Sequence, residues 1–218
     1  QLEIVCAGGT HYHKTETFLK LVPPWDQSAV SFHDCDDANE LAFLGVSSRG
    51  TPIWINRRVV DADVVIGVGS ITAHVFCGFG GGGKILMPGV AGRDTINANH
   101  SLMIAPGCRT GQIDGNPSRQ DIDEIAAVAG LDFVANSIVN YDKRVLGFVA
   151  GDPLRAHRKG VELFEKHYGI PQYTEADLLV VGVLPGRNGS LSKAKRALCD
   201  MRDFVRPGGH VILIADCG

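Results

Sequence analysis

The chain has 218 residues, of which 44% are hydrophobic, and carries a formal net charge of −3. This length is enough for one large domain, or one and a half ordinary ones, with a buried core. A slightly acidic chain lacks the broad basic surface that nucleic acid or an anionic membrane requires. Neither is therefore an expected partner.

Six cysteines are scattered along the chain without a C-x-x-C pair, as in cytoplasmic proteins with reduced thiols. They are Cys6, Cys35, Cys77, Cys108, Cys199 and Cys217. No run of about 18 apolar residues predicts a membrane span, and no charged-then-apolar leader precedes the first strand. We therefore expect the cytoplasm. The chain starts at Gln1 directly before a strand-like run and stops at Gly218 just after another, so it looks like a piece of a longer protein.

Short runs rich in Val and Ile alternate with helical patterns, which is typical of an α/β domain with a largely parallel sheet. The predicted strands, in chain order, are Leu2–Cys6, Pro52–Asn56, Asp63–Val68, Asp132–Val139, Val145–Ala150, Leu178–Val183 and His210–Ala215. One helix is predicted from the capping-box-like Ser118-x-x-Asp121 to Gly130. A second runs over Pro153–Tyr168 and ends at Gly169, a residue free to take the positive φ of a helix C-terminus.

The segment Gly169-Ile-Pro171 interrupts the pattern. After it, a strand, a helix over Ser190–Phe204 and a final strand form one β-α-β unit. We therefore predict a mixed or parallel α/β domain over residues 1–171, which carries the cofactor site and the catalytic groups. The start of a second, truncated α/β domain follows over residues 172–218.

The segment Gly78-Phe-Gly-Gly-Gly-Gly83-Lys84-Ile85 matches the first seven positions of the P-loop pattern G-x-x-x-x-G-K-[ST]. Ile85 lacks the hydroxyl that holds magnesium, and Pro88-Gly89 interrupts the helix that a P-loop needs. Gly67-Val-Gly69 begins like a dinucleotide fingerprint, but the third glycine position is Thr72. Both motifs are therefore weak evidence for a nucleotide.

Four consecutive glycines before a lysine are unfavourable in themselves, because each costs about 0.5–1 kcal/mol of backbone order relative to alanine. The run favours a ligand lying against backbone N–H groups. Lys84 would then neutralise a phosphate or, once desolvated, form a covalent bond through its amine. The alternatives are a mobile surface loop, and a non-covalent nucleotide- or phosphate-binding protein that uses Gly80 to Lys84.

Three of the eight histidines lie near glycine turns: His11, His74 and His100. Imidazole titrates near neutrality and binds nickel, copper and zinc, so they could be two acid/base groups and one metal ligand, or the ligands of a zinc hydrolase. Each could also be structural. His33-Asp-Cys-Asp-Asp37 mixes metal-binding groups, but consecutive side chains on a strand point to opposite faces, which favours a structural role.

Several motifs, in order along nearly the whole chain, resemble the nickel-dependent lactate racemase family. The spacings of ten and sixteen residues between Lys84 and its flanking histidines also match. The motifs are Gly9-Thr10-His11, Ala62-Asp63, His74-x3-Gly78-Phe79-x-Gly-Gly-x-Lys84, Pro88-Gly89, Thr95-Ile96-x2-Asn99-His100 and Gly147-x2-Ala150-Gly151-Asp152-x3-Ala156-His157.

The resemblance implies a nickel pincer nucleotide, a pyridinium-3,5-bisthiocarboxylic acid mononucleotide, attached covalently at Lys84. Nickel would be held by one carbon and two sulfurs of the cofactor and by His100. The backbone of Gly80, Gly81, Gly82 and Gly83 would line the cofactor's phosphate. Maturation would require partner enzymes that make the cofactor.

The implied activity is that of an isomerase, a racemase or epimerase of a lactate-like 2-hydroxy acid. Hydride abstraction and return through the cofactor would invert the centre, with His11 and His74 as the acid/base pair. A family lysine near the substrate falls on Arg196, with Lys195 one residue away, and an arginine would bind the substrate carboxylate bidentately. The family's Asp-His-Thr-Arg-Pro type segment, expected before the first strand, is not in this sequence.

Overall fold

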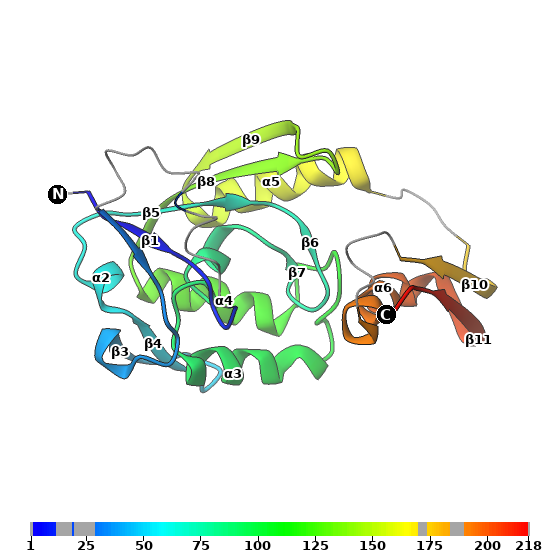
Figure 1. Cartoon of the computed structure of the whole chain (residues 1–218), viewed down its shortest axis with the longest axis horizontal. Helices are drawn as coiled ribbons and strands as arrows, with labels where there is room; N and C mark the ends of the chain where they lie inside the picture. Colours follow the sequence, from blue (N-terminus) through cyan, green and yellow to red (C-terminus); the bar gives the residue numbers. More distant parts are fainter. Residues whose placement is uncertain (1, 12–18, 20–28, 170–173, 184–189, 218) are drawn as a thin grey trace.

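The computed structural model describes residues 2–11, 19, 29–169, 174–183 and 190–217 (Figure 1). It confirms an α/β fold, but its strands form five small sheets and many pairs are antiparallel. β1 (Ile4–Cys6) pairs in parallel with β2 (Val30–Phe32), whereas β3 (Leu41–Val46) and β4 (Pro52–Asn56) form an antiparallel hairpin. The pairings are therefore mixed, which is one of the two predicted arrangements, and the described strands do not form one largely parallel sheet.

The central sheet has the strand order β5-β8-β9. β5 (Val65–Ser70) runs parallel to β8 (Leu131–Val139), which pairs antiparallel with β9 (Val145–Gly151). A short turn is enough to join β8 to β9, whereas the parallel pair needs a long crossover. That crossover between β5 and β8 contains the segment from His74 to His100.

α5 (Pro153–Tyr168) lies against the central sheet (Figure 1). Two glycines allow its close approach. A Cβ built on Gly147 would lie 2.4 Å from Leu163 Cδ2, and one on Gly160 would lie 2.9 Å from Ile71 Cγ1. Asp152 caps the helix, because its Oδ1 accepts a hydrogen bond of 2.8 Å from the Arg155 N–H.

α3 (Arg93–Ser101) and α4 (Pro117–Val128) belong to the same crossover and close the main core. The core is largely aliphatic and includes the fully buried Ile53, Ile55, Ile96, Ile122 and Ile125. Short elements complete this part of the chain: α2 (Arg57–Val60), β6 (Ala73–His74), β7 (Gly78–Phe79), and the 3-10 turns η2 (Ala38–Glu40), η3 (Gly82–Ile85) and η4 (Leu102–Ile104).

Two predicted helix ends are wrong. Asn116, not Ser118, is the N-cap of α4, and its side chain accepts the Arg119 N–H at 3.0 Å with Pro117 at the first helical position. The Ser118 hydroxyl instead donates to Asn99 Oδ1 at 3.1 Å. Gly169 ends α5 with φ −65°, in extended backbone, rather than with a positive φ.

The C-terminal segment forms a sheet of its own. β10 (Ala176–Gly182) and β11 (Val205–Ile214) pair in parallel, with α6 (Leu191–Met201) and η5 (Arg202–Phe204) between them. Thr110 donates a hydrogen bond to Asp200 Oδ1 at 2.9 Å and links α6 to the first part of the chain. The boundary near residue 171 lies outside the described residues and stays a prediction.

All six cysteines are free thiols, as expected. Within the described residues, no helix combines the length and the apolar character needed to cross a membrane.

Candidate functional site

The glycine-rich segment is a compact turn between β6 and Lys84. β6 and β7 pair antiparallel, so that His74 lies opposite Gly78. Gly81 has φ 78° and Gly82 φ 58°, in the left-handed region that side-chain-bearing residues rarely adopt. η3 then begins at Gly82 and carries Lys84.

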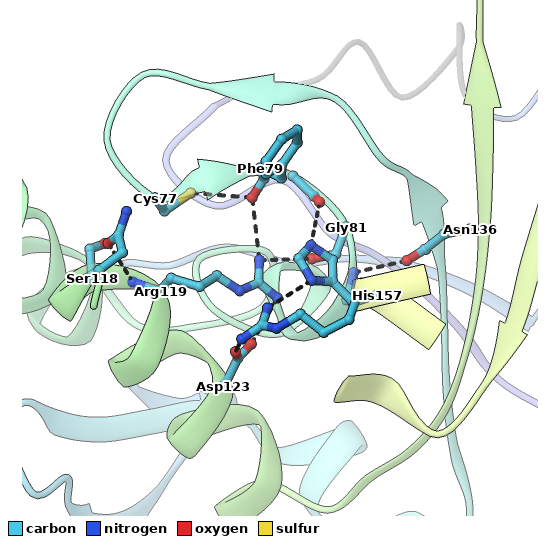
Figure 2. A network of polar contacts seen from close by, with 12 residues as sticks. Cys77, Phe79, Gly81, Ser118, Arg119, Asp123, Asn136 and His157 are labelled. Atoms are coloured by element: carbon cyan, nitrogen blue, oxygen red, sulfur yellow. Dashed lines mark hydrogen bonds and ion pairs between the residues drawn. The ribbon is translucent and has the colours of Figure 1, made fainter. Parts of the chain in front are cut away.

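Three successive carbonyl groups of this turn are bound from one side by buried side chains (Figure 2). Arg119 Nη1 donates to the carbonyl oxygens of Phe79 and Gly81, each at 3.3 Å. His157 Nε2 donates to the carbonyl oxygen of Gly80 at 3.0 Å. The turn is therefore fixed by α4 and α5 together.

The charge of Arg119, whose side chain is fully buried, is balanced by Asp123 at 2.7 Å. Asp123 also pairs with Arg158 at 3.2 Å. His157 is neutral, because burial and then the charge of Arg119 lower its pKa to about 2. Since a carbonyl oxygen only accepts, the proton of His157 is on Nε2, and Nδ1 accepts from Arg158 Nη1 at 3.1 Å.

The glycines were expected to let a ligand lie against the backbone, but they also let side chains of the protein itself approach closely. A Cβ on Gly82 would lie 2.8 Å from Arg119 Nη2 and 2.9 Å from His157 Cβ. One on Gly83 would lie 2.8 Å from Ala126 Cβ, and one on Gly81 would lie 2.5 Å from Ile71 Cδ1. The absence of side chains is therefore required by packing within the protein, whether or not a ligand is bound.

Of the four backbone N–H groups expected to line a phosphate, two already have hydrogen-bond partners within the protein. The Gly80 N–H donates to the Thr72 carbonyl at 2.7 Å, and the Gly82 N–H donates to Asn136 Oδ1 at 2.9 Å. The turn leads into a short 3-10 helix and not into the α-helix of a P-loop. Gly67, from the weak dinucleotide motif, lies within β5, where a Cβ would come within 2.6 Å of Ile85 Cγ2.

Lys84 is largely withdrawn from water. Burial lowers the pKa of its amine, and the nearby charges of Arg119 and Arg196 lower it further. A desolvated amine with a lowered pKa is the form of lysine that acts as a nucleophile towards an acyl group. The Lys84 amine is therefore better suited to form a covalent bond than to neutralise the charge of a phosphate.

His74 is held in the neutral state beside Lys84. Burial, then the charges of Lys84, Arg196 and His100, lower its pKa to about 3. Its Nδ1 lies 3.0 Å from the Sγ of Cys77 and accepts the Cys77 backbone N–H at 3.4 Å. Nδ1 is thus occupied by protein groups.

Phe76 contacts two of the three predicted site histidines. Its ring meets that of His74 edge-on, with centroids 4.6 Å apart, and that of His100 in the same way at 5.2 Å. Phe76 thus lies against both imidazoles and connects β6 with α3.

His100 occupies the last turn of α3, which the sequence did not predict as a helix. Asn99 fixes that turn, because its Nδ2 donates to Asp121 Oδ2 at 2.8 Å and to the Ser118 carbonyl at 3.1 Å. Burial, then the charges of Lys84 and His11, lower the pKa of His100. A neutral imidazole is the form that binds a metal.

His11 is exposed at the end of the loop after β1. The Gly9 N–H donates to the Gly89 carbonyl at 2.9 Å, which ties this loop to the segment just after Lys84. His11 is close enough to His100 to act on it electrostatically, as Lys84 also does.

The segment His33–Asp37, for which a structural role was favoured, was also considered as a metal site. The turn after β2 does bring the ligand atoms of Asp34, Cys35 and Asp36 within 4.8 Å of one another, contrary to expectation. Arg93 occupies this cluster, with Nη2 2.6 Å from Asp36 Oδ2 and 3.3 Å from Cys35 Sγ. Among the described residues, the ligand atoms of His11, His74 and His100 are not grouped in this way, and the zinc-hydrolase alternative stays untested.

Comparison with known proteins now decides the family. The family model of the lactate racemase N-terminal domain matches residues 1–111, half of the 218-residue chain. The chain belongs to the lactate racemase family. It is 29% identical over 215 residues to the lactate racemase of Lactiplantibacillus plantarum, covering 94% of this chain and 50% of that protein. For the lactate racemase of Thermoanaerobacterium thermosaccharolyticum, the identity is 27% over 217 residues, with 95% and 50% coverage.

Two solved structures share this fold. The lactate racemase apoprotein of Thermoanaerobacterium thermosaccharolyticum superposes with a TM-score of 0.90 at 26% identity, over 99% of this chain and 53% of that one. A protein from Thermotoga maritima shares the fold, with a TM-score of 0.66 at 23% identity over 82% of this chain and 50% of that one. This chain spans about half the length of the curated lactate racemases it matches.

Within this lactate racemase fold, several side chains around Lys84 were not predicted from the sequence. The family motifs do not specify the residue type at Phe76, Cys77 or Asn136. Arg119 lies in a predicted helix, and nothing in its local sequence marks it as part of a site. His157 belongs to a family motif, but only the structure shows its bond to the Gly80 carbonyl. Arg196 acts through its charge on both His74 and Lys84, whereas Lys195 is not among the charges that shift either group.

Proposed function

We propose that this chain forms the cofactor-binding and acid/base part of a racemase or epimerase of a lactate-like 2-hydroxy acid. The observation that carries the proposal is the convergence of two neutral, desolvated histidines on a desolvated lysine. Membership of the lactate racemase family supports the same reaction class. His11 completes the set from the loop after β1.

Lys84 and His100 are the residues that would hold the nickel pincer nucleotide. The donor set fits: an amine biased towards its neutral form for an amide-type bond, and a neutral imidazole for nickel. When bound, the cofactor would supply the hydride acceptor and donor at C2 of the hydroxy acid. The protein supplies position, exclusion of water and proton transfer.

In this proposal His11 and His74 exchange the hydroxyl proton of the substrate. A neutral imidazole takes this proton as the substrate becomes a planar keto acid, and an imidazolium returns it when the hydroxyl group is restored. Desolvation of His74 keeps it in the base form until substrate binds. Arg196 is the candidate for the substrate carboxylate, because its guanidinium can bind both oxygens.

The decisive experiment is intact-protein mass spectrometry after co-expression with the enzymes that make the cofactor. We expect an added mass of one cofactor in the wild-type chain and none in Lys84→Ala. Lys159→Ala, which removes an exposed lysine, is the matched control and should keep the adduct. Interconversion of the lactate enantiomers is then measured on the loaded protein.

Lys84→Arg separates this proposal from non-covalent phosphate binding. Arginine keeps a positive charge but cannot form the amide-type bond, so the adduct should disappear. If instead no wild-type adduct forms and ATP raises the melting temperature of both the wild type and Lys84→Arg, the nucleotide-binding alternative replaces the proposal.

A further inference from the structure

The Cys77 thiol is within hydrogen-bonding distance of two acceptors. Its Sγ lies 3.0 Å from His74 Nδ1 on one side and 3.5 Å from the Phe79 carbonyl oxygen on the other. Figure 2 shows the sulfur directed at that carbonyl, which Arg119 also binds. Cys77 is fully buried, and burial raises the pKa of its thiol, so the S–H is present at neutral pH.

The thiol hydrogen has only one position at a time, and the two positions select different forms of His74. With the S–H turned to Nδ1, that nitrogen accepts and the imidazole proton is on Nε2. With the S–H turned to the Phe79 carbonyl, the sulfur accepts an N–H from Nδ1 and the lone pair is on Nε2. Only the second form can take a proton at Nε2.

The backbone N–H of Cys77, taken alone, favours the form of His74 that has its proton on Nε2. The Cys77 N–H can only donate, and it meets Nδ1 at 3.4 Å. Without the thiol, Nδ1 would therefore remain an acceptor, and the neutral ring would keep its proton on Nε2. Cys77 is the group that makes the other tautomer available.

We propose that Cys77 is a positioning residue whose thiol, by rotating between His74 Nδ1 and the Phe79 carbonyl, sets the tautomer and thus the proton-accepting nitrogen of His74. This inference rests on the proposed acid/base role of His74.

The proton balance is simple. In the base form, Nδ1–H donates to Sγ, and S–H donates to the Phe79 oxygen. Nε2 then takes the substrate hydroxyl proton, which gives an imidazolium with both nitrogens protonated and the sulfur unchanged. Return of the Nε2 proton restores the starting form, so no bond to sulfur is made or broken.

The test is the tautomer of His74, read from ¹⁵N NMR of histidine-labelled protein and assigned with His74→Gln. We expect the wild type to show both tautomers in exchange and Cys77→Ser to keep them, because a hydroxyl also donates and accepts. Cys77→Ala should move His74 to the Nε2–H form alone. Cys77→Val, which fills the volume without an S–H, serves in its place if the alanine variant does not fold.

Equal tautomer populations in wild type and Cys77→Ala would overturn the inference, as would a serine variant that behaves like alanine. In the cofactor-loaded protein, Cys77→Ala should lower kcat for lactate racemisation at least about tenfold, with KM little changed and Cys77→Ser within about threefold of wild type. Absence of racemisation in the loaded wild type would instead refute the proposed function, while the tautomer measurement would still decide the role of Cys77.

Discussion

His157 Nε2 lies 3.0 Å from the carbonyl oxygen of Gly80, and both residues are buried. This bond joins the first turns of α5 to the turn that carries Lys84. Together with the two bonds from Arg119, it gives three consecutive carbonyls of this turn buried hydrogen-bond donors. The glycine turn is thus a rigid support for the lysine, and its stability can be tested without any cofactor.

Substituting Gly82 should be much more costly than an ordinary glycine substitution. Gly82→Ala adds a methyl group 2.8 Å from Arg119 Nη2 at a φ of 58°, so steric overlap adds to left-handed strain. We expect a loss of about 2–4 kcal/mol in the free energy of unfolding. Gly130→Ala is the matched control, because its φ is 77° but nothing lies within 4 Å of the added atom, and it should cost about 1 kcal/mol. Urea denaturation of both variants measures the difference, and equal losses would contradict the packing role of Gly82.

The buried His157 should make unfolding sensitive to acid. Its pKa falls from 6.5 to about 2 on folding, so between these values the unfolded chain binds a proton that the folded chain does not. The free energy of unfolding therefore decreases as pH falls below 6.5, by up to about 1.4 kcal/mol per pH unit from this residue. His157→Gln removes this contribution and should make the decline between pH 6 and pH 4 shallower by that amount.

His167→Gln is the control for this measurement, because His167 is exposed on the same helix. Its stability should follow the wild-type pH dependence. At pH 7 His157→Gln should be less stable than wild type, because the bond to the Gly80 carbonyl is disturbed. An unchanged slope in His157→Gln would mean that His157 is protonated in the folded protein.

Asp121 joins α3, which carries His100, to the rest of the core. Its carboxylate is fully buried and accepts hydrogen bonds from Ser47 at 2.6 Å, Thr51 at 2.9 Å and Asn99 at 2.8 Å. Asp121→Ala leaves three buried donors without an acceptor, and we expect a loss of about 3–5 kcal/mol.

Glu124→Ala is the comparison for Asp121→Ala. Glu124 is on the same helix and accepts from Ser48 in the same loop, but its hydrogen bonds are exposed, so the loss should stay within about 1 kcal/mol. Thermal and urea denaturation of the two variants will show whether the burial of the hydrogen bonds decides how much stability is lost. Similar losses would argue against Asp121 as the anchor of α3.

The regular elements were largely predictable because they carry local signals. The β4 bounds agree residue for residue, and α5 runs over Pro153–Tyr168 as predicted. α3 was missed because its sequence, Arg93–Ser101, is polar and lacks an apolar stripe, so its helix depends on tertiary bonds from Thr95 and Asn99. β2, β6 and β7 were missed because strands of two or three residues give no periodic pattern.

The histidines and Lys84 were singled out by their spacing and by the family resemblance, and their roles stay predictions, whereas the packing reason for the glycines was missed. A run of glycines signals a close approach without saying what approaches, and here Arg119, His157 and Ala126 do so from distant parts of the chain. The same limit applies to Cys77, because a lone buried cysteine has no sequence signal that distinguishes it from core packing. Non-local contacts therefore decide the role of each of these residues.

Lys84 should react with acylating reagents at a lower pH than an ordinary lysine. Burial, with Arg119 and Arg196 adding to it, lowers its pKa below the ordinary 10.5, so more of its amine is in the neutral, nucleophilic form at a given pH. Competitive labelling with acetic anhydride over a pH series, followed by peptide mass spectrometry, gives the midpoint for Lys84. Limited access lowers the rate at every pH but does not move the midpoint. In urea, where the burial is lost, the midpoint should return to the ordinary value. A midpoint in the folded protein equal to that in urea would show that Lys84 is not activated, and would remove the main physical argument for a covalent anchor at this position.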